Sequence, residues 1–130
     1  MFQQINEELE VIIEEMECKL EKAVAEFAKA NGFINKLTGS VDNGPGNKGV
    51  SYTTEATYPA VIYCRPMSNG LYDLSYRVPL RNTISNGYIC KPEEDIPADF
   101  KKEVEALIKI KPDDEEYKMN STELAEKGII

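Results

Sequence analysis

Residues 50–90, VSYTTEATYPAVIYCRPMSNGLYDLSYRVPLRNTISNGYIC, carry the clearest structural signal in this chain. Short runs rich in tyrosine, valine and isoleucine alternate here with proline, glycine and asparagine, which is typical of strands joined by tight turns. We therefore predict four antiparallel strands, over Val50–Thr57, Tyr58–Pro66, Leu71–Leu80 and Thr83–Cys90. The tripeptide Ser-Asn-Gly occurs twice, at 68–70 as the expected turn and at 85–87 as either a second turn or a bulge in the fourth strand.

A two-residue turn at Asn69-Gly70 predicts which side chains share a face, because side chains alternate along a strand. It places Tyr63 opposite Tyr76 as a structural aromatic pair. The predicted core face is the one dominated by large groups: Val61, Tyr63, Arg65, Met67, Tyr72, Leu74, Tyr76, Val78 and Leu80. The other face is semi-polar and is expected to hold a ligand pocket or to meet a second subunit; it carries Ala60, Ile62, Cys64, Asp73, Ser75 and Arg77.

Residues 2–31 are predicted to form one long amphipathic helix that ends at Asn31-Gly32. Its apolar positions recur at spacings of three and four: Phe2, Ile5, Leu9, Ile12, Met16, Leu20, Val24 and Phe27. A helix of this length spans about 45 Å, whereas a compact domain of this size is only ~30 Å across. We therefore expect segment 1–32 to protrude and to drive homo-oligomer formation.

The segments on either side of the sheet complete the domain. Residues 38–49, TGSVDNGPGNKG, form a flexible loop that is either a lid or a plain linker. Its Gly44, Gly46 and Gly49 have dinucleotide-loop spacing, but no strand precedes them and no helix follows. A C-terminal helix is predicted from Pro97 to about Ile110, followed by a short tail helix at 121–127 whose Asn120 and Glu123 are spaced as a capping box.

The fold class is thus α+β, and the 130 residues form a single domain. The expected order is a long N-terminal helix, a flexible loop at 38–49, a four-stranded antiparallel meander sheet at 50–90, and a C-terminal helical part at 95–130 that contains the C-terminal helix and the short tail helix.

Composition excludes several function classes. The net charge of −8 argues against direct nucleic-acid binding through phosphate neutralisation. The acidic N-terminus lacks the features of a signal peptide, and no run of apolar residues is long enough to span a bilayer, so a cytoplasmic protein without a membrane partner is expected. The chain has no histidine, and its three cysteines are widely spaced, so we expect no catalytic residues, no metal, no cofactor and no enzyme activity.

The distribution of the basic residues indicates a candidate site. All three arginines lie within residues 51–90, and all twelve lysines lie outside that stretch. The same stretch holds six of the seven tyrosines and only two acids, Glu55 and Asp73. Arginine stacks on aromatic rings and binds carboxylate or phosphate through two hydrogen bonds. The candidate ligand-binding residues are Arg65, Arg77, Arg81, Tyr63, Tyr76 and Asn86. The alternative is an ordinary exposed sheet face, with Arg77 paired to Asp73.

Two functions fit these features. The first is a small acidic, non-catalytic binding protein that acts as an inhibitor or sequestering protein through contacts with a basic protein partner, in the manner of immunity-type or phage anti-defence inhibitors. The second is a sponge that binds an anionic, nucleotide-like small molecule on the tyrosine- and arginine-rich sheet. A third possibility is an assembly component that uses the first helix to oligomerise.

Overall fold

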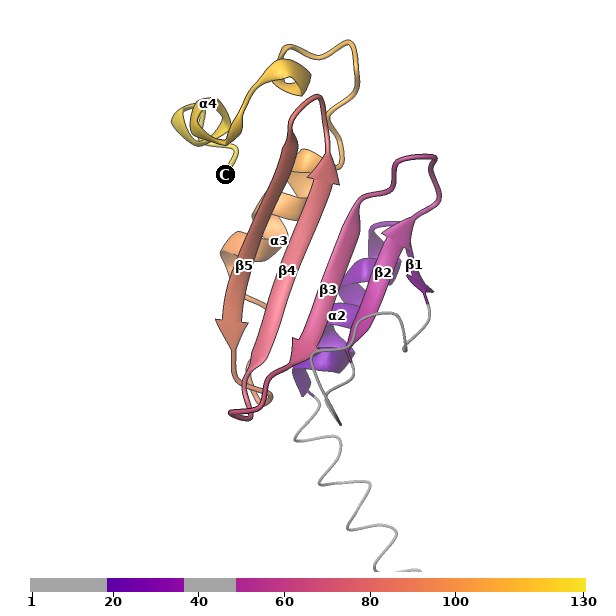
Figure 1. Ribbon diagram of the computed structural model, residues 1–130, viewed down its shortest axis with the longest axis vertical. Helices are drawn as coiled ribbons and strands as arrows, with labels where there is room; N and C mark the ends of the chain where they lie inside the picture. Colours follow the sequence, from indigo (N-terminus) through magenta and orange to yellow (C-terminus); the bar gives the residue numbers. More distant parts are fainter. Residues whose placement is uncertain (1–18, 37–48) are drawn as a thin grey trace, which may run out of the picture.

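The computed structural model describes residues 19–36 and 49–130. In these ranges one antiparallel sheet has its strands in sequence order, with the bounds β1 (Phe33–Lys36), β2 (Val50–Thr54), β3 (Val61–Pro66), β4 (Tyr72–Pro79) and β5 (Thr83–Cys90). Helices α2 (Lys19–Ala30) and α3 (Ala98–Leu107) lie against one face of the sheet, α2 behind β1–β3 and α3 behind β4 and β5 (Figure 1). The predicted α+β meander is confirmed, with one more strand than expected.

The additional strand is β1, which follows directly after the end of α2. Gly32 takes a positive φ of 80° and ends the helix, as the Asn31-Gly32 signal predicted. The strand that follows has only four residues, too few to establish an alternating pattern in the sequence. Of the helix predicted over 2–31, the structure describes the last part as α2. The stripe from Ile5 to Met16 and the predicted loop up to residue 48 lie outside the described residues.

The β3–β4 hairpin has a longer turn than the one predicted. The backbone N–H of Met67 donates to the carbonyl of Leu71 at 2.8 Å, and that of Gly70 donates to the carbonyl of Met67 at 3.1 Å. Three residues therefore form the loop, and Gly70 has the positive φ of 83° that such a turn needs at its end. The side chain of Asn69 accepts a hydrogen bond from the N–H of Leu71 at 3.1 Å. The Asn-Gly signal located the turn correctly but not its length.

This difference of one residue shifts the β3–β4 register by one position. Because neighbouring side chains point to opposite faces, each β3 side chain lies on the face opposite to the predicted one. Ile62 lies opposite Tyr76, and Tyr63 lies opposite Ser75. The predicted Tyr63–Tyr76 pair is wrong, since the two rings lie on opposite faces of the sheet. The predicted core face is correct on β4 and wrong on β3.

The hydrophobic core lies between the sheet and the two helices. The strands contribute Tyr52, Ile62, Cys64, Leu74, Tyr76, Val78, Ile84 and Cys90, and the helices contribute Leu20, Val24, Phe27, Ala28, Phe100, Val104 and Leu107. At its centre the ring of Phe100 contacts three aromatic neighbours, with centroid distances of 6.1 Å to Phe27, 5.7 Å to Tyr76 and 6.0 Å to Tyr88. We call this side of the sheet the helix-side face.

The opposite side, which we call the outer face, carries Tyr63, Arg65, Asp73, Ser75, Arg77, Ser85, Gly87 and Ile89. None of the helices in the described ranges covers it (Figure 1). Exposure decreases toward β2: Ser51 on β2 and Val61 at the start of β3 are only 5% and 4% exposed. The accessible part of the outer face therefore lies over β4 and β5.

The C-terminal part completes the fold. After α3 come a 3-10 turn, η1 (Glu115–Lys118), and helix α4 (Ser121–Glu126). The predicted capping box is confirmed: Asn120 accepts from the N–H of Glu123 at 2.9 Å, and the Glu123 carboxylate accepts from the N–H of Asn120 at 3.4 Å. Among the described helices, none has the length and apolar character needed to cross a membrane.

Candidate functional site

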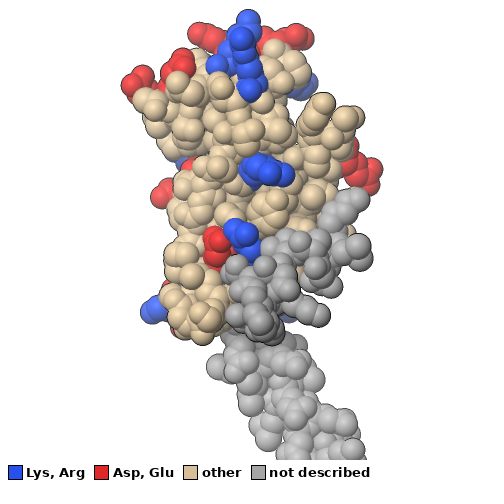
Figure 2. Space-filling model, viewed as in Figure 1, with Lys and Arg blue, Asp and Glu red and all other residues tan. Residues whose placement is uncertain are grey.

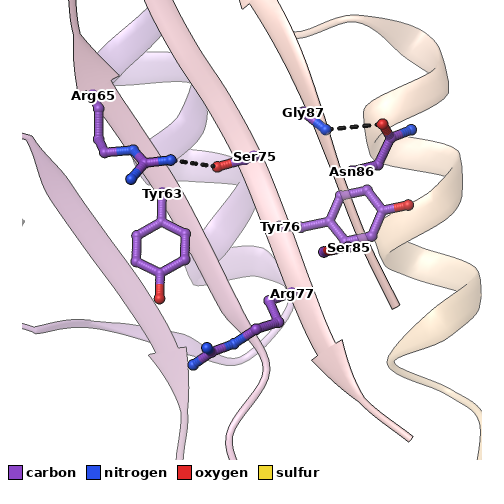
Figure 3. A pocket seen from close by; sticks show the side chains of 8 residues that line it. All are labelled: Tyr63, Arg65, Ser75, Tyr76, Arg77, Ser85, Asn86 and Gly87. Atoms are coloured by element: carbon purple, nitrogen blue, oxygen red, sulfur yellow. Dashed lines mark hydrogen bonds between the residues drawn. The ribbon is translucent and has the colours of Figure 1, made fainter. Parts of the chain in front are cut away.

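The outer face has a hollow of about 330 Å³ that is open to solvent. Its outer-face lining consists of Tyr63, Arg65, Ser75, Arg77, Ser85 and Gly87. The hollow exists because small residues adjoin large ones: Ser75 and Gly87 lie opposite each other on β4 and β5, beside the ring of Tyr63. Figure 3 shows Tyr63 and Arg65 projecting from β3 and Arg77 from β4 around this depression.

Arg65 is held in place by three neighbours. Its guanidinium forms an ion pair with Asp73 at 2.7 Å, directly across the β3–β4 ladder, and donates to the Ser75 hydroxyl at 3.5 Å. The same guanidinium lies 5.2 Å from the centre of the Tyr63 ring, within the range of a cation–π contact. Its charge is therefore already balanced by Asp73.

Gly49 makes room for the stem of Arg65. A Cβ atom at position 49 would lie 2.8 Å from Cγ of Arg65 and 2.9 Å from the carbonyl oxygen of Cys64. Both distances are too short, so a larger residue would displace either the arginine or the β3 backbone. Packing therefore accounts for glycine at position 49, without reference to a nucleotide-binding motif.

Arg77 differs from Arg65 although both lie on the same face. Its side chain is exposed and has no hydrogen bond or ion pair with residues 19–36 or 49–130. The alternative of an Arg77–Asp73 pair is wrong, because Asp73 bonds Arg65 instead. Figure 3 shows the Arg77 side chain running toward β3, beside the Tyr63 ring. The hollow thus contains one neutralised and one available guanidinium group.

The helix-side face carries a second polar cluster, centred on Glu103 of α3. This carboxylate is only 5% exposed. It accepts hydrogen bonds from the Tyr76 hydroxyl at 2.9 Å, from the Asn86 amide at 3.1 Å and from the Tyr88 hydroxyl. Asn86 also accepts from the backbone N–H of Gly87 at 2.9 Å. The buried carboxylate is therefore satisfied by three donors within the chain.

The Glu103 cluster perturbs both of its tyrosines. Burial, and next the hydrogen bond to the Glu103 carboxylate, raise the pKa of Tyr76 well above its usual range. The same two causes in the same order raise the pKa of Tyr88. Both effects favour the neutral phenol, because a phenolate would be desolvated and would lie beside a carboxylate. These hydroxyls therefore act as structural donors.

The six sequence-predicted site residues divide into three groups. Tyr63, Arg65 and Arg77 meet at the outer-face hollow. Tyr76 and Asn86 also line the hollow, but their side chains donate hydrogen bonds to Glu103 on the helix-side face. Arg81 lies in the loop between β4 and β5, where its backbone N–H donates to the carbonyl of Tyr117 at 3.2 Å. Five of the six candidates therefore line the hollow, and three of them, Tyr63, Arg65 and Arg77, have their side chains on the outer face.

Several residues of these clusters were not among the six predicted ligand-binding residues, although Ser75 was placed on the semi-polar face and Ser85 and Gly87 in the repeated tripeptide. Ser75, Ser85 and Gly87 form the floor of the hollow, and small polar residues in a strand give little signal by themselves. The burial of Glu103 could have been predicted from the sequence. It lies three residues after Phe100 and four before Leu107, on the apolar side of α3. An acid at such a position predicts a buried carboxylate with internal donors.

Other depressions of the surface have different character. One of about 520 Å³ at the end of the sheet is lined mainly by apolar groups, including Tyr58, Leu80, Leu107 and Ile110. It brings together no charged side chains. Within the described part of the chain, no three acidic or cysteine side chains converge to hold a metal ion. A further depression, of about 370 Å³ beside α3, has polar and charged lining that includes Asp99, Lys102 and Glu103. The outer-face hollow differs from both in placing two arginines beside an aromatic ring.

Comparison with protein-family models finds no matching family, and comparisons with curated proteins and with solved structures likewise find no match.

Proposed function

We propose that this chain is a small non-catalytic binding protein that acts as an inhibitor or sequestering protein, with the outer face over β4 and β5 as its contact surface. The observation that carries the proposal is that face: it has no cover from the described helices and few acidic groups, in a chain of net charge −8. Figure 2 shows a largely uncharged surface whose acidic groups lie mainly at its edges.

The shape and charge of the face support contact with another protein. The hollow is shallow and open, whereas sites that enclose small molecules bury most of the ligand surface. With Arg65 and Arg77 against Asp73, the face carries one net positive charge (two minus one). It therefore suits an acidic patch on a partner. The net charge of −8 favours a basic partner. Such a partner would contact the acidic surface of this chain away from the outer face, in the manner of immunity-type or anti-defence inhibitors.

A second candidate is sequestration of an anionic, nucleotide-like small molecule on the same face. The specific support is the conjunction of an aromatic ring, Tyr63, with the available guanidinium of Arg77 and the hydroxyl of Ser85. A ring can stack on a base while a guanidinium binds phosphate.

Two further parts of the proposal rest on the sequence. Self-association through the N-terminal helix is supported by its length and by a stripe that falls outside the described residues. A cytoplasmic location is likewise proposed from the sequence alone.

A matched pair of charge reversals tests the contact surface. Arg77→Glu changes the outer face, and Lys102→Glu makes the same charge change at an exposed position on α3. Tagged wild-type and variant proteins are used for quantitative affinity capture from cells. We expect one partner to be retained by the wild type and by Lys102→Glu, and to be lost with Arg77→Glu. Equal retention by all three proteins would exclude the outer face as the contact surface.

A thermal-melting panel of nucleotides and cyclic nucleotides separates the second candidate from the first. A ligand present at 100 times its dissociation constant stabilises the native state by about 2.7 kcal/mol, which is readily measured. A clear rise with one ligand, abolished by Arg77→Glu, would favour small-molecule sequestration over protein contact.

A further inference from the structure

We infer that the outer-face hollow is an anion subsite in which Arg77 binds the oxygens of a phosphate or carboxylate, while Arg65 is a positioning residue. This inference rests on the proposed function and gives its contact surface a specific chemistry.

The first argument is the unequal state of the two arginines. Arg65 already has a carboxylate, since Asp73 lies 2.7 Å from its guanidinium. Arg77 has no acidic partner in the described ranges, and its side chain is exposed. A guanidinium presents a planar set of donors that matches the oxygens of carboxylate and phosphate. Arg65 uses Nη2 for Asp73 and Ser75, and its Nε is buried, so the exposed guanidinium without a carboxylate partner in the described ranges is that of Arg77.

The second argument is the set of groups around Arg77. Ser85 lies directly opposite it on β5 and offers a hydroxyl donor. Tyr63 lies on the neighbouring strand, and Figure 3 shows its ring beside the Arg77 side chain. The ring provides a flat apolar wall for whatever group carries the anion. The hollow therefore combines charge, hydroxyl donors and one apolar surface within about 330 Å³.

The third argument is that Arg65 is fixed from both sides of its strand. On one side it bonds Asp73 and Ser75, and on the other its stem packs on Gly49, where no Cβ atom fits. A side chain held in this way keeps the Tyr63 ring in place through the 5.2 Å cation–π contact. Arg65 thus shapes the wall, and Asp73 keeps the local positive charge low when no anion is present.

The same chemistry has two sources, a phosphate of a small molecule and a carboxylate of an acidic protein segment. The experiment uses three probes with isotope-labelled protein and NMR detection: inorganic phosphate, adenosine 5′-monophosphate and a short peptide rich in glutamate. We expect saturable shifts of the Arg77 side-chain N–H and of the Gly87 and Ser85 amides. A stronger response to the nucleotide than to the peptide identifies a small-molecule source, and the reverse identifies a protein segment.

Three variants test the inference, and one of them is a control. Arg77→Gln should weaken binding of the best probe by at least about tenfold, the loss expected for a hydrogen bond to a charged group. Asp73→Asn should strengthen it, because Arg65 then contributes an unneutralised charge. Lys102→Gln, an exposed change on α3, should leave binding unchanged.

Non-saturating shifts spread over many lysines, or equal affinity of the wild type and Arg77→Gln, would overturn the anion subsite. If the probes fail in this way while Arg77→Glu still abolishes partner capture, the inference alone is wrong and the outer face remains the contact surface. If partner capture also survives Arg77→Glu, the proposed function fails with it.

Discussion

The two faces of the sheet carry polar clusters that differ in how their hydrogen-bonding groups are used. On the helix-side face, the Glu103 carboxylate is 5% exposed and accepts from Tyr76, Tyr88 and Asn86. On the outer face, Asp73 balances Arg65, and Arg77 has no partner in the described part of the chain. One cluster is internally complete, and the other leaves a cation available.

This difference implies that the helix-side cluster contributes to stability, whereas the outer face is available for binding. A buried carboxylate without its donors is costly, so the Glu103 cluster is expected to stabilise the fold. An exposed guanidinium contributes little to folding, because water solvates it in both the folded and the unfolded chain. Substitutions on the helix-side face should therefore lower the free energy of unfolding, whereas substitutions on the outer face should weaken binding and change stability little.

The largest effect is expected for Tyr76→Ala. Tyr76 is 1% exposed and its ring packs on Phe100, so its removal should lower the free energy of unfolding by about 3–5 kcal/mol. Tyr63→Ala on the outer face should lower it by about 1 kcal/mol or less. Urea denaturation measures both. Equal losses would contradict the register in which these two rings lie on opposite faces.

The Glu103→Leu variant tests the buried cluster itself. It keeps an apolar side chain of similar size but leaves the donors of Tyr76 and Asn86 without their acceptor, which should destabilise the fold by about 1–3 kcal/mol. Glu105→Leu, at an exposed position on the same helix, is the control and should stay within about 0.5 kcal/mol of the wild type. A neutral Glu103→Leu would mean that the cluster does not stabilise the fold.

Two glycines provide a matched test of packing behind the hollow. Gly49→Ala places a Cβ atom 2.9 Å from the carbonyl oxygen of Cys64 and should cost about 1–3 kcal/mol, as other overpacked sites do. Gly87→Ala meets only ordinary contacts, the nearest being 3.5 Å to Asp73, so its thermal melting should be close to that of the wild type. A silent Gly49→Ala would show that β2 and β3 can separate to admit the methyl group.

Alkaline pH should weaken the helix-side cluster. In the folded chain the pKa of Tyr76 and that of Tyr88 lie above the usual value, whereas the unfolded tyrosines ionise near pH ~10. A raised folded pKa gives stability that is complete below the unfolded pKa and is lost as pH rises above it. The free energy of unfolding should therefore fall above about pH 10.

The Tyr88→Phe variant checks the cause of this pH dependence. Removing one of the two hydroxyls should make the alkaline loss of stability smaller than in the wild type, because one fewer raised pKa contributes. Tyr63→Phe is the control, since its hydroxyl has no hydrogen bond within the described ranges. Identical slopes for the wild type and Tyr88→Phe would assign the pH dependence to other groups.

The smallest effect on stability is expected for Arg77→Gln. The side chain is exposed and unpaired among the described residues, so the free energy of unfolding should change by no more than about 0.5 kcal/mol. Thermal melting measures it. A large loss would mean that Arg77 has a structural role, and the contrast between the two faces would then fail.

Local signals in the sequence determined the elements and much of their order. The 83–90 strand, the end of α2 at Asn31-Gly32 and the capping box at Asn120 were predicted with their residues, because each depends on groups within a few positions of one another. The clustering of arginine and tyrosine likewise indicated the sheet as the candidate site before any contact was known.

Which arginine is paired and which is available depends on how the strands pair, and this could not be predicted from local signals. The Asn69-Gly70 signal is compatible with loops of two or three residues, and the choice between them changes the face of every side chain on β3. Packing resolves it, because the three-residue loop places Ile62 and Cys64 against the helices and leaves Tyr63 outside. The ion pair of Arg65 with Asp73 follows from that register, and so does the lack of a partner for Arg77 among the described residues.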